Sequence, residues 1–370
     1  MDSDFERWMV LQALPQVGPK RLARLRSLNP AWPEGWLPGL PPMAAAALRL
    51  WLEHPRRSPL TAPVEEALEW QAQGVVHGQQ RHLLHPGHPR WPALLDQIAD
   101  PPVVLWALGD LDALTPPRLA LVGSRRPTRE GLVNARSFAI SLAEAGWCLV
   151  SGMALGIDGA AQAAALDVGG RSVAVLAGGV DVVYPGQHGS LYRRLRDDGG
   201  LLLAESAPGR RPHSGDFPRR NRIVTGVSCG VLVVEAAEHS GSLVSARLAG
   251  EQGREVLAVP GSIHSPQARG CLRLIREGAA LIRHPDDLFE ELASWGPRQG
   301  AVSSTGSEAP SGAAARSLLD LLSARPLPVD VLMGLAGCDV ATCQRELTLL
   351  EIEGHAGLVA GGWVRLGGGS

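Results

Sequence analysis

The segment from Leu119 to Thr128 reads Leu-Ala-Leu-Val-Gly-Ser-Arg-Arg-Pro-Thr. Its first four residues form an apolar run short enough for a buried strand, Gly123 and Ser124 end that run, and Pro127 with Thr128 opens a helix-like segment. A strand, a tight turn and a helix start aim backbone N–H groups and the positive end of a helix at an anion. We therefore expect this loop to bind phosphate and the rest of the chain to be arranged around it.

The composition is that of a globular protein with a sizeable core, because 45% of the 370 residues are hydrophobic and 19% are charged. No apolar run reaches the length of a membrane span, and the first residues, Met1-Asp2-Ser3-Asp4, lack the basic region of a signal peptide. The five cysteines form no CxxC pair, which indicates reduced structural thiols. We therefore expect a cytoplasmic protein without membrane insertion.

The net charge of −2 does not by itself indicate nucleic-acid binding. The basic residues are nevertheless unusual, because Lys20 is the only lysine among them and all the others are arginine. Arginine binds phosphate through two hydrogen bonds at once and stacks on bases, which lysine does not.

Between about residues 118 and 292, short apolar runs alternate with helix-like segments. This pattern predicts an α/β domain with a doubly wound, Rossmann-like parallel sheet covered on both faces. A further strand is expected to end at Gly109. The other expected strands are 119–122, 147–150, 172–176, 201–204, 230–234, 255–259 and 280–282, and the expected helices are 128–145, 156–167, 190–198, 219–225, 240–252, 270–277 and 286–292.

Two smaller units are expected to flank this domain. Residues 5 to about 60 look helical, with a Pro-Gln-Val-Gly-Pro turn from Pro15 to Pro19 between two amphipathic pieces. The turn resembles a helix-hairpin-helix motif, whose amides meet a DNA phosphate, and a plain hairpin of two packed helices is the favoured alternative. The predicted division is a helical domain at 1–84, a Rossmann-like domain at 85–295, a flexible linker at 296–313 and a winged helix at 314–370.

The C-terminal unit is predicted to contain helices at 314–323, 328–335 and 340–353 and strands at 357–360 and 362–366. The third helix, which would read DNA in a winged helix, carries one arginine and three glutamates. That is a poor surface for a phosphate backbone. A protein-contact or regulatory role is therefore favoured for this unit.

In open α/β sheets, ligands bind at the carboxyl ends of the strands. The residues that follow the expected strands are rich in glycine, serine and arginine, so nearly every turn offers N–H groups, hydroxyls or guanidinium groups to an anion. We predict a site for several phosphates at this edge. The candidate residues of this site are Gly123, Ser124, Arg125, Arg126, Arg210, Arg211, Phe217, Arg219, Arg220, Asn221, Arg222, Ser240, Gly241 and Ser242.

Several familiar sites are absent from the sequence. Gly123 is followed by Ser-Arg-Arg rather than by the second glycine of a dinucleotide fingerprint. The sequence also lacks the Gly-Lys-Ser/Thr of a P-loop, the HExxH and Cys/His spacings of metal sites and the GxSxG of a serine nucleophile. We therefore expect no cofactor, no metal and no catalytic residues. Asp158 and Glu235 could form a carboxylate pair for acid–base chemistry. A helix-start cap for Asp158 and an arginine partner for Glu235 are the favoured alternatives.

Six segments, taken in order, resemble the signature of the DNA-processing protein DprA (Smf) family, and the similarity covers roughly residues 86–292. The segments are Val122-Gly-Ser-Arg-Arg-Pro-Thr, Val150-Ser-Gly-Met-Ala-Leu-Gly-Ile-Asp, Ala177-Gly-Gly-Val-Asp-Val-Val-Tyr-Pro, Phe217-Pro-Arg-Arg-Asn-Arg-Ile-Val, Val234-Glu-Ala-Ala-Glu-His-Ser-Gly-Ser-Leu and Val259-Pro-Gly-Ser. The N-terminal hairpin and the C-terminal winged helix also look like those of the family's longer members.

The resemblance implies a single-stranded-DNA-binding protein of natural transformation. Such a protein protects incoming DNA, loads the RecA recombinase onto it and works as a homodimer without known catalysis. The resemblance places DNA phosphates at Gly123, Ser124 and Arg125 and the dimer contact late in the domain, near Cys271 to Ile282. It also implies a basic DNA-binding region formed by Arg210, Arg211, Arg219, Arg220 and Arg222.

The sequence departs from the family pattern at three positions. Ala160-Ala161-Gln162 stands where a histidine is common, Ser245-Ala246 replaces a Thr-Ala pair, and Gly186-Gln187-His188 lacks a common lysine that Arg193 or Arg194 could replace. Two alternatives stay open. One is a nucleotide N-glycosidase-like enzyme on the same fold, although the Pro-Gly-Gly-x-Gly-Thr segment of such enzymes is missing. The other is a nucleotide sensor read out by the winged helix.

Overall fold

The computed structural model describes residues 3–73 and 80–295, together with positions 322, 327, 329, 332, 333, 343, 347, 350, 351, 355–359 and 362–365. The chain divides into two compact units, residues 1–299 and 300–370. Each unit is described by itself.

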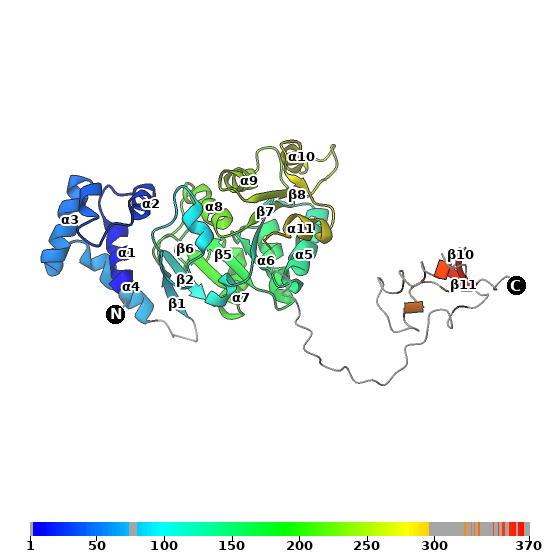
Figure 1. The fold of residues 1–370 in the computed structure, drawn as a ribbon, viewed down its shortest axis with the longest axis horizontal. Helices are drawn as coiled ribbons and strands as arrows, with labels where there is room; N and C mark the ends of the chain where they lie inside the picture. Colours follow the sequence, from blue (N-terminus) through cyan, green and yellow to red (C-terminus); the bar gives the residue numbers. More distant parts are fainter. Residues whose placement is uncertain are drawn as a thin grey trace, which may run out of the picture. The chain divides into compact units, whose positions relative to one another are not determined.

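A nine-stranded sheet forms the centre of the first unit, in the order β1-β2-β6-β5-β4-β3-β7-β8-β9 (Figure 1). Every neighbouring pair from β6 to β9 is parallel, whereas β2 runs antiparallel to β6 and β1 antiparallel to β2. The predicted doubly wound sheet is confirmed. The strands are β1 (Arg81–Leu84), β2 (Leu105–Gly109), β3 (Arg118–Val122), β4 (Cys148–Ser151), β5 (Ser172–Leu176), β6 (Leu201–Ala204), β7 (Gly230–Val233), β8 (Glu255–Ala258) and β9 (Ala280–Leu281).

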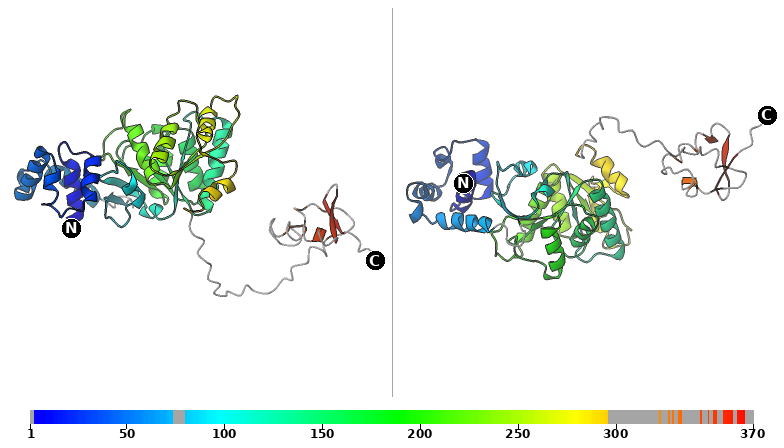
Figure 2. Two further views of the ribbon diagram at one scale, coloured as in Figure 1. Left: turned by 45° about the horizontal axis from the view of Figure 1, so that its top comes forward. Right: turned by 90° about the horizontal axis from the view of Figure 1, so that it is seen from below.

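Helices cover both faces of the sheet, as Figures 1 and 2 show. Along β3, Leu119 and Leu121 belong to the core on one face and Ala120 and Val122 to the core on the other, as the alternation of side chains along a strand requires. The first face carries α5 (Arg129–Glu144), α6 (Ile157–Asp167) and α11 (Pro285–Glu291), and the second carries α8 (Asp216–Gly226), α9 (Ser242–Glu251) and α10 (Arg269–Arg276).

The helices predicted between residues 118 and 292 agree with the observed ones to within one residue, except at two starts. The helix predicted to start at Arg219 is α8, which begins at Asp216, because Pro218 is tolerated in the first turn of a helix. The helix predicted to start at Ser240 is α9, which begins at Ser242. Both helices start next to the carboxyl ends of the strands. Each difference therefore changes which residues form a helix start at that edge.

The N-terminal helices share a core with one end of the sheet. They are α1 (Ser3–Ala13), α2 (Pro19–Ser27), α3 (Pro42–Glu53) and α4 (Thr61–Ala72), and they lie beside the β1–β2 edge (Figure 2). One continuous cluster of buried residues joins them to α7 (Gly189–Asp197) and to β2, β5 and β6. The predicted Pro-Gln-Val-Gly-Pro turn connects α1 and α2, and Gln16 takes the positive φ of 60° there.

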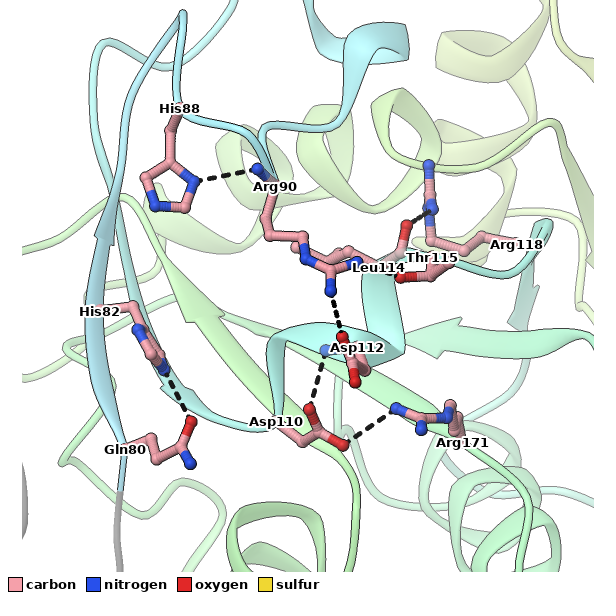
Figure 3. A network of polar contacts seen from close by, with 10 residues as sticks. All are labelled: Gln80, His82, His88, Arg90, Asp110, Asp112, Leu114, Thr115, Arg118 and Arg171. Carbon is pink, nitrogen blue, oxygen red and sulfur yellow. Dashed lines mark hydrogen bonds and ion pairs between the residues drawn. The ribbon is translucent and has the colours of Figure 1, made fainter.

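The connection from β2 to β3 runs along the amino ends of the parallel strands. It contains the short helix η4 (Leu111–Leu114) and is held by arginines that reach it from other segments (Figure 3). Arg171, directly before β5, donates from Nη1 to Asp110 Oδ2 at 2.9 Å, and Arg90 donates from Nη2 to Asp112 Oδ1 at 2.5 Å. These contacts fix the β2–β3 connection to the segment before β5 and to the loop that contains Arg90.

The described part of the second unit is a hairpin with a small core. β10 (Ala356–Val359) pairs antiparallel with β11 (Gly362–Arg365), each within one residue of its predicted position. Leu332, Leu347 and Trp363 are among the buried residues. The predicted linker and the bounds of the three predicted helices lie outside the described residues. Among the helices that the structure describes, none has the length and hydropathy needed to cross a bilayer.

We expect Cys148, Cys229 and Cys271 to resist alkylation in the folded protein. Burial raises the pKa of each thiol to about 12, and the thiolate is the reactive form. Treatment with iodoacetamide at mildly alkaline pH, followed by peptide mass spectrometry, should leave all three unmodified in the native protein. All three should react after unfolding in guanidinium chloride, and rapid labelling without denaturant would contradict their buried positions.

Candidate nucleic-acid interface

A cleft of about 1030 Å³ lies at the carboxyl ends of β3, β4 and β7. The strand order reverses here, because the chain passes from β3 to β4 on one side and returns to β7 on the other. The loops diverge at such a switch point, which is where open α/β sheets bind their ligands. The predicted residues that line the cleft are Gly123, Ser124, Arg125, Arg126, Phe217, Arg220, Asn221, Ser240, Gly241 and Ser242.

The loop after β3 is tied to the loop after β7. The Ser124 N–H donates to the Glu235 carbonyl at 2.7 Å. The Glu235 carboxylate accepts from the Thr128 N–H at 3.1 Å and from Thr128 Oγ1 at 2.5 Å. Thr128 Oγ1 also accepts from the Gly131 N–H at 3.0 Å and so caps α5. The predicted pairing of Glu235 with an arginine is therefore wrong, because its carboxylate binds Thr128.

These contacts also use some of the amides expected to face an anion. The Ser124 N–H is taken by Glu235, and the Arg126 N–H donates to Ser124 Oγ at 3.1 Å. In the described part of the chain, the amides of Arg125 and Gly241 have no acceptor. Gly241 precedes α9, whose first turn carries no acidic residue. The free donors of the cleft are thus fewer than expected, and side chains must supply more of the charge.

Arg125 supplies such a charge at the edge of the cleft. It is exposed, and its guanidinium carbon lies 5.5 Å from the centre of the Phe217 ring. The Tyr184 ring lies 5.5 Å from Phe217 and is 52% exposed. Arg126 is exposed beside it. A cation next to two aromatic rings can bind a phosphate and a base of the same strand.

Arg220 supports the cleft from beneath. It is 7% exposed, and its Nη1 donates to the Gly152 carbonyl at 2.7 Å and to the Val175 carbonyl. Burial lowers the pKa of Arg220 to about 10, although the nearby Asp158 carboxylate partly opposes this shift. Arg220 therefore joins the ends of β4 and β5, and its predicted contact with DNA stays a prediction, because it also lines the cleft.

Asp158 belongs to the same buried group. Burial raises the pKa of its carboxyl, and Oδ2 accepts from the Gly152 N–H at 3.1 Å. The predicted helix cap is wrong, because Gly156 is the residue that precedes α6 and Asp158 lies within its first turn. Asp158 binds the loop after β4, whereas Glu235 binds the loop after β3. The structure therefore does not support the two carboxylates as a pair for acid–base chemistry.

Arg222 is removed from the cleft by burial. It is 4% exposed, and its guanidinium lies 2.6 Å from Glu205 Oε1 and 3.2 Å from Asp100 Oδ2. Two carboxylates neutralise the charge of this buried arginine, and its burial keeps it out of reach of a phosphate. The prediction of a DNA contact at Arg222 is corrected accordingly, because the structure gives this residue a structural role.

The remaining predicted arginines lie beside the cleft. Arg219 pairs with Glu205 at 3.2 Å and Arg210 with Asp216 at 3.0 Å, and both line a groove of about 360 Å³ next to the cleft. Arg211 is exposed. Arg193 and Arg194, proposed from the sequence to replace a lysine, are not among the described residues that line the cleft.

Two functional candidates at the cleft were not predicted. Arg269, the first residue of α10, is exposed and lines the cleft. It follows β8 along the chain, so the strand-end rule that selected the other arginines could have found it. Tyr184 packs on Phe217 from the loop after β5. Its aromatic partner lies more than thirty positions away in the sequence, and no local pattern shows that the two rings meet.

The fold and the cleft define an open, doubly wound α/β protein with an arginine-bearing cleft at its switch point. A family model described as DNA recombination-mediator protein A matches residues 82–293, and one described as the DprA winged helix domain matches residues 302–362. The chain therefore belongs to the DNA recombination-mediator protein A (DprA/Smf) family, and the predicted family and winged-helix unit are confirmed.

Individual relatives agree with this assignment. The Smf protein of Escherichia coli K12 is 39% identical over 320 residues, which are 85% of this chain and 83% of that protein. The structure of DprA from Streptococcus pneumoniae matches with a TM-score of 0.62 and 31% identity, over 78% of this chain and 98% of that chain. A structure of DprA from Helicobacter pylori, described for its single-stranded-DNA binding mode, matches with a TM-score of 0.52 and 30% identity, over 58% and 96% of the two chains.

The substitution Thr128→Val should lower the free energy of unfolding by about 1–2 kcal/mol. Valine keeps the shape but removes the hydroxyl that caps α5 and binds Glu235. Thr128→Ser keeps the hydroxyl and should stay close to the original stability. Chemical denaturation of both variants measures the difference, and equal stability of Thr128→Val and the unaltered protein would show that this link between the loops carries little energy.

Proposed function

We propose that this protein binds single-stranded DNA in the cleft at the carboxyl ends of β3, β4 and β7. The observation that carries the proposal is the exposed Arg125 guanidinium beside the Phe217 ring at the edge of that cleft. Arginine can bind a phosphate through two hydrogen bonds, and an aromatic ring stacks on an unpaired base. A single strand offers both groups at once, whereas a duplex keeps its bases paired.

The hydroxyls at the start of α9 support this proposal from the opposite wall. Ser240 Oγ and Ser242 Oγ lie 2.7 Å apart, and both residues line the cleft. Hydroxyls and the free Gly241 amide can donate to a second phosphate. The cleft also contains Glu238, so its charge is mixed and the strand must follow the arginines on the Phe217 side. We propose Gly123, Ser124, Arg125, Arg126, Phe217, Asn221, Ser240, Gly241 and Ser242 as contact residues, with Arg210, Arg211 and Arg219 beside them.

The family membership extends the proposal beyond binding. A DprA relative from Helicobacter pylori is described as binding single-stranded DNA, and the family model is described as a recombination mediator. We infer that this protein protects incoming DNA in the cytoplasm and loads the RecA recombinase onto it during natural transformation. We also infer that it acts as a homodimer through the region between Cys271 and Ile282 and that its winged helix contacts protein. This is a binding function, and no reaction is proposed.

The substitution Arg125→Ala should weaken the binding of single-stranded DNA at least tenfold at moderate salt, or by roughly 1.4 kcal/mol. Fluorescence anisotropy with a labelled oligonucleotide measures this change, and the salt dependence of Kd should also become less steep. Arg136→Ala is the matched control, because Arg136 is an exposed arginine of α5 outside the cleft lining. An Arg125→Ala variant with unchanged Kd would rule out the proposed role.

The unaltered protein should bind a single strand more tightly than the duplex of the same sequence, with little dependence on base sequence. Gel shifts with both forms at two salt concentrations make this comparison. A mononucleotide in excess should compete only weakly. Strong competition by a mononucleotide would favour the nucleotide-sensor alternative, and equal binding of duplex and single strand would contradict the role of base stacking.

A further inference from the structure

A second pocket, of about 480 Å³, lies between the N-terminal helices and the sheet. Its walls come from α1, α4, β2 and the loop after β6. It shares no lining residue with the cleft at the carboxyl ends of β3, β4 and β7. Its volume falls within the range of ligand pockets, so it is a candidate site separate from the cleft.

The walls of this pocket are largely apolar. The Trp70 and Trp106 rings meet edge to face with their centres 5.1 Å apart, and Met9, Pro63 and Pro208 add further apolar surface. Trp70 and the two prolines are only half-buried, so they present part of that surface to the pocket. Protein interfaces gain most of their binding energy where a large side chain of one partner fills such a hollow in the other.

One edge of the pocket is acidic. Glu66 lines the pocket, and it is exposed together with Glu65 and Glu69 on the same helix, α4. This helix contains no lysine or arginine. Within the part of the chain that the structure describes, none of the three glutamates takes part in an ion pair. Three such carboxylates attract a cationic partner and repel the phosphates of a nucleic acid.

The arginines of the neighbouring segments have other contacts. Arg7 of α1 lies within 5.4 Å of the centres of three other tryptophan rings, and Arg210 lines the neighbouring groove. Arg81 lies 5.3 Å from the centre of the Trp70 ring and donates to the Trp70 carbonyl at 3.3 Å. None of the three lines the pocket, so the charge of Glu66 stays available to a partner.

We propose that this pocket docks a partner protein through a segment in which a large apolar side chain is flanked by lysine or arginine. The apolar side chain enters the hollow beside Trp70, and the cations face Glu66 and Glu69. The apolar contact supplies the affinity, and the carboxylates select the charge of the segment. This inference goes beyond the proposed function, because it concerns a protein bound at α1 and α4 and does not depend on DNA in the cleft.

A short peptide tests the proposal with the full chain and without DNA. The probe is Ac-Arg-Lys-Phe-Leu-Lys-Arg-NH2, and isothermal titration calorimetry at low salt measures its Kd. One control keeps the apolar pair between acids, Ac-Glu-Asp-Phe-Leu-Asp-Glu-NH2, and the other keeps the cations without the apolar pair, Ac-Arg-Lys-Gly-Ser-Lys-Arg-NH2. The probe should bind at least about tenfold more tightly than either control and more weakly at high salt. No binding of the probe, or equal binding of all three peptides, would overturn the proposal.

Two variants with matched controls test the two parts of the pocket. Glu66→Lys should raise the Kd of the probe at least about fivefold, whereas Glu144→Lys, at an exposed position of α5, should leave it unchanged. Ala207→Trp places an indole at the pocket and should raise Kd about tenfold, whereas Ala145→Trp should not. Ala207 and Ala145 are exposed, so both variants should keep the native circular-dichroism spectrum. Unchanged affinity of both Glu66→Lys and Ala207→Trp would contradict the docking site.

Photo-crosslinking locates the bound peptide. A probe with benzoylphenylalanine in place of phenylalanine should form adducts with fragments that contain Met9, Trp70 or Pro208. Adducts confined to fragments of the cleft would overturn the proposal. Sedimentation without peptide tests the alternative that a second copy of this chain occupies the pocket. A change of oligomeric state in Glu66→Lys would favour that alternative over a different partner protein, whereas an unchanged state together with the expected adducts supports the proposal.

Discussion

The hydrogen bonds between Glu235 and the loop after β3 are the constraint on which the cleft depends. They join two loops that diverge from neighbouring strands at the switch point. They connect the start of α5 and the Arg125 loop directly to the segment that leads from β7 to α9. The sheet itself requires no such link, because its strands are held by their own ladder. Because the Ser124 N–H donates to Glu235, it is not available to an anion. The cleft therefore depends on guanidinium groups more than on backbone N–H groups.

The same region shows how arginine serves two different purposes within one helix. Arg219 is exposed at the surface of α8, whereas Arg220 and Arg222 are buried. Arg220 bonds to backbone carbonyls and Arg222 to carboxylates. The planar guanidinium can make several hydrogen bonds in fixed directions, so it can join strand ends that an ammonium group could not. The two buried arginines thus hold the strand ends and loops beneath the cleft through hydrogen bonds and ion pairs within the protein.

Sequence reasoning could predict the sheet because each strand is a short, fully apolar run between turn residues, and runs such as 201–204 need no distant information. It could not predict β1, because Arg81 and His82 make half of that edge strand polar and its pairing with β2 is decided in space. Sequence reasoning selected loops that do line the cleft, but it could not tell which of their arginines are exposed and which are buried. The partners Glu205 and Asp100 come from segments far from Arg222 in the chain, and only the folded structure brings them together.

The N-terminal helices contribute to the same buried cluster as β2, β5 and β6, beside the two clusters that the sheet forms with the helices on its faces. Val10 of α1 and Leu48 of α3 belong to this cluster together with Trp106 of β2 and Leu202 of β6. Truncation of the helices would therefore expose apolar surface of β2, β5 and β6 to water.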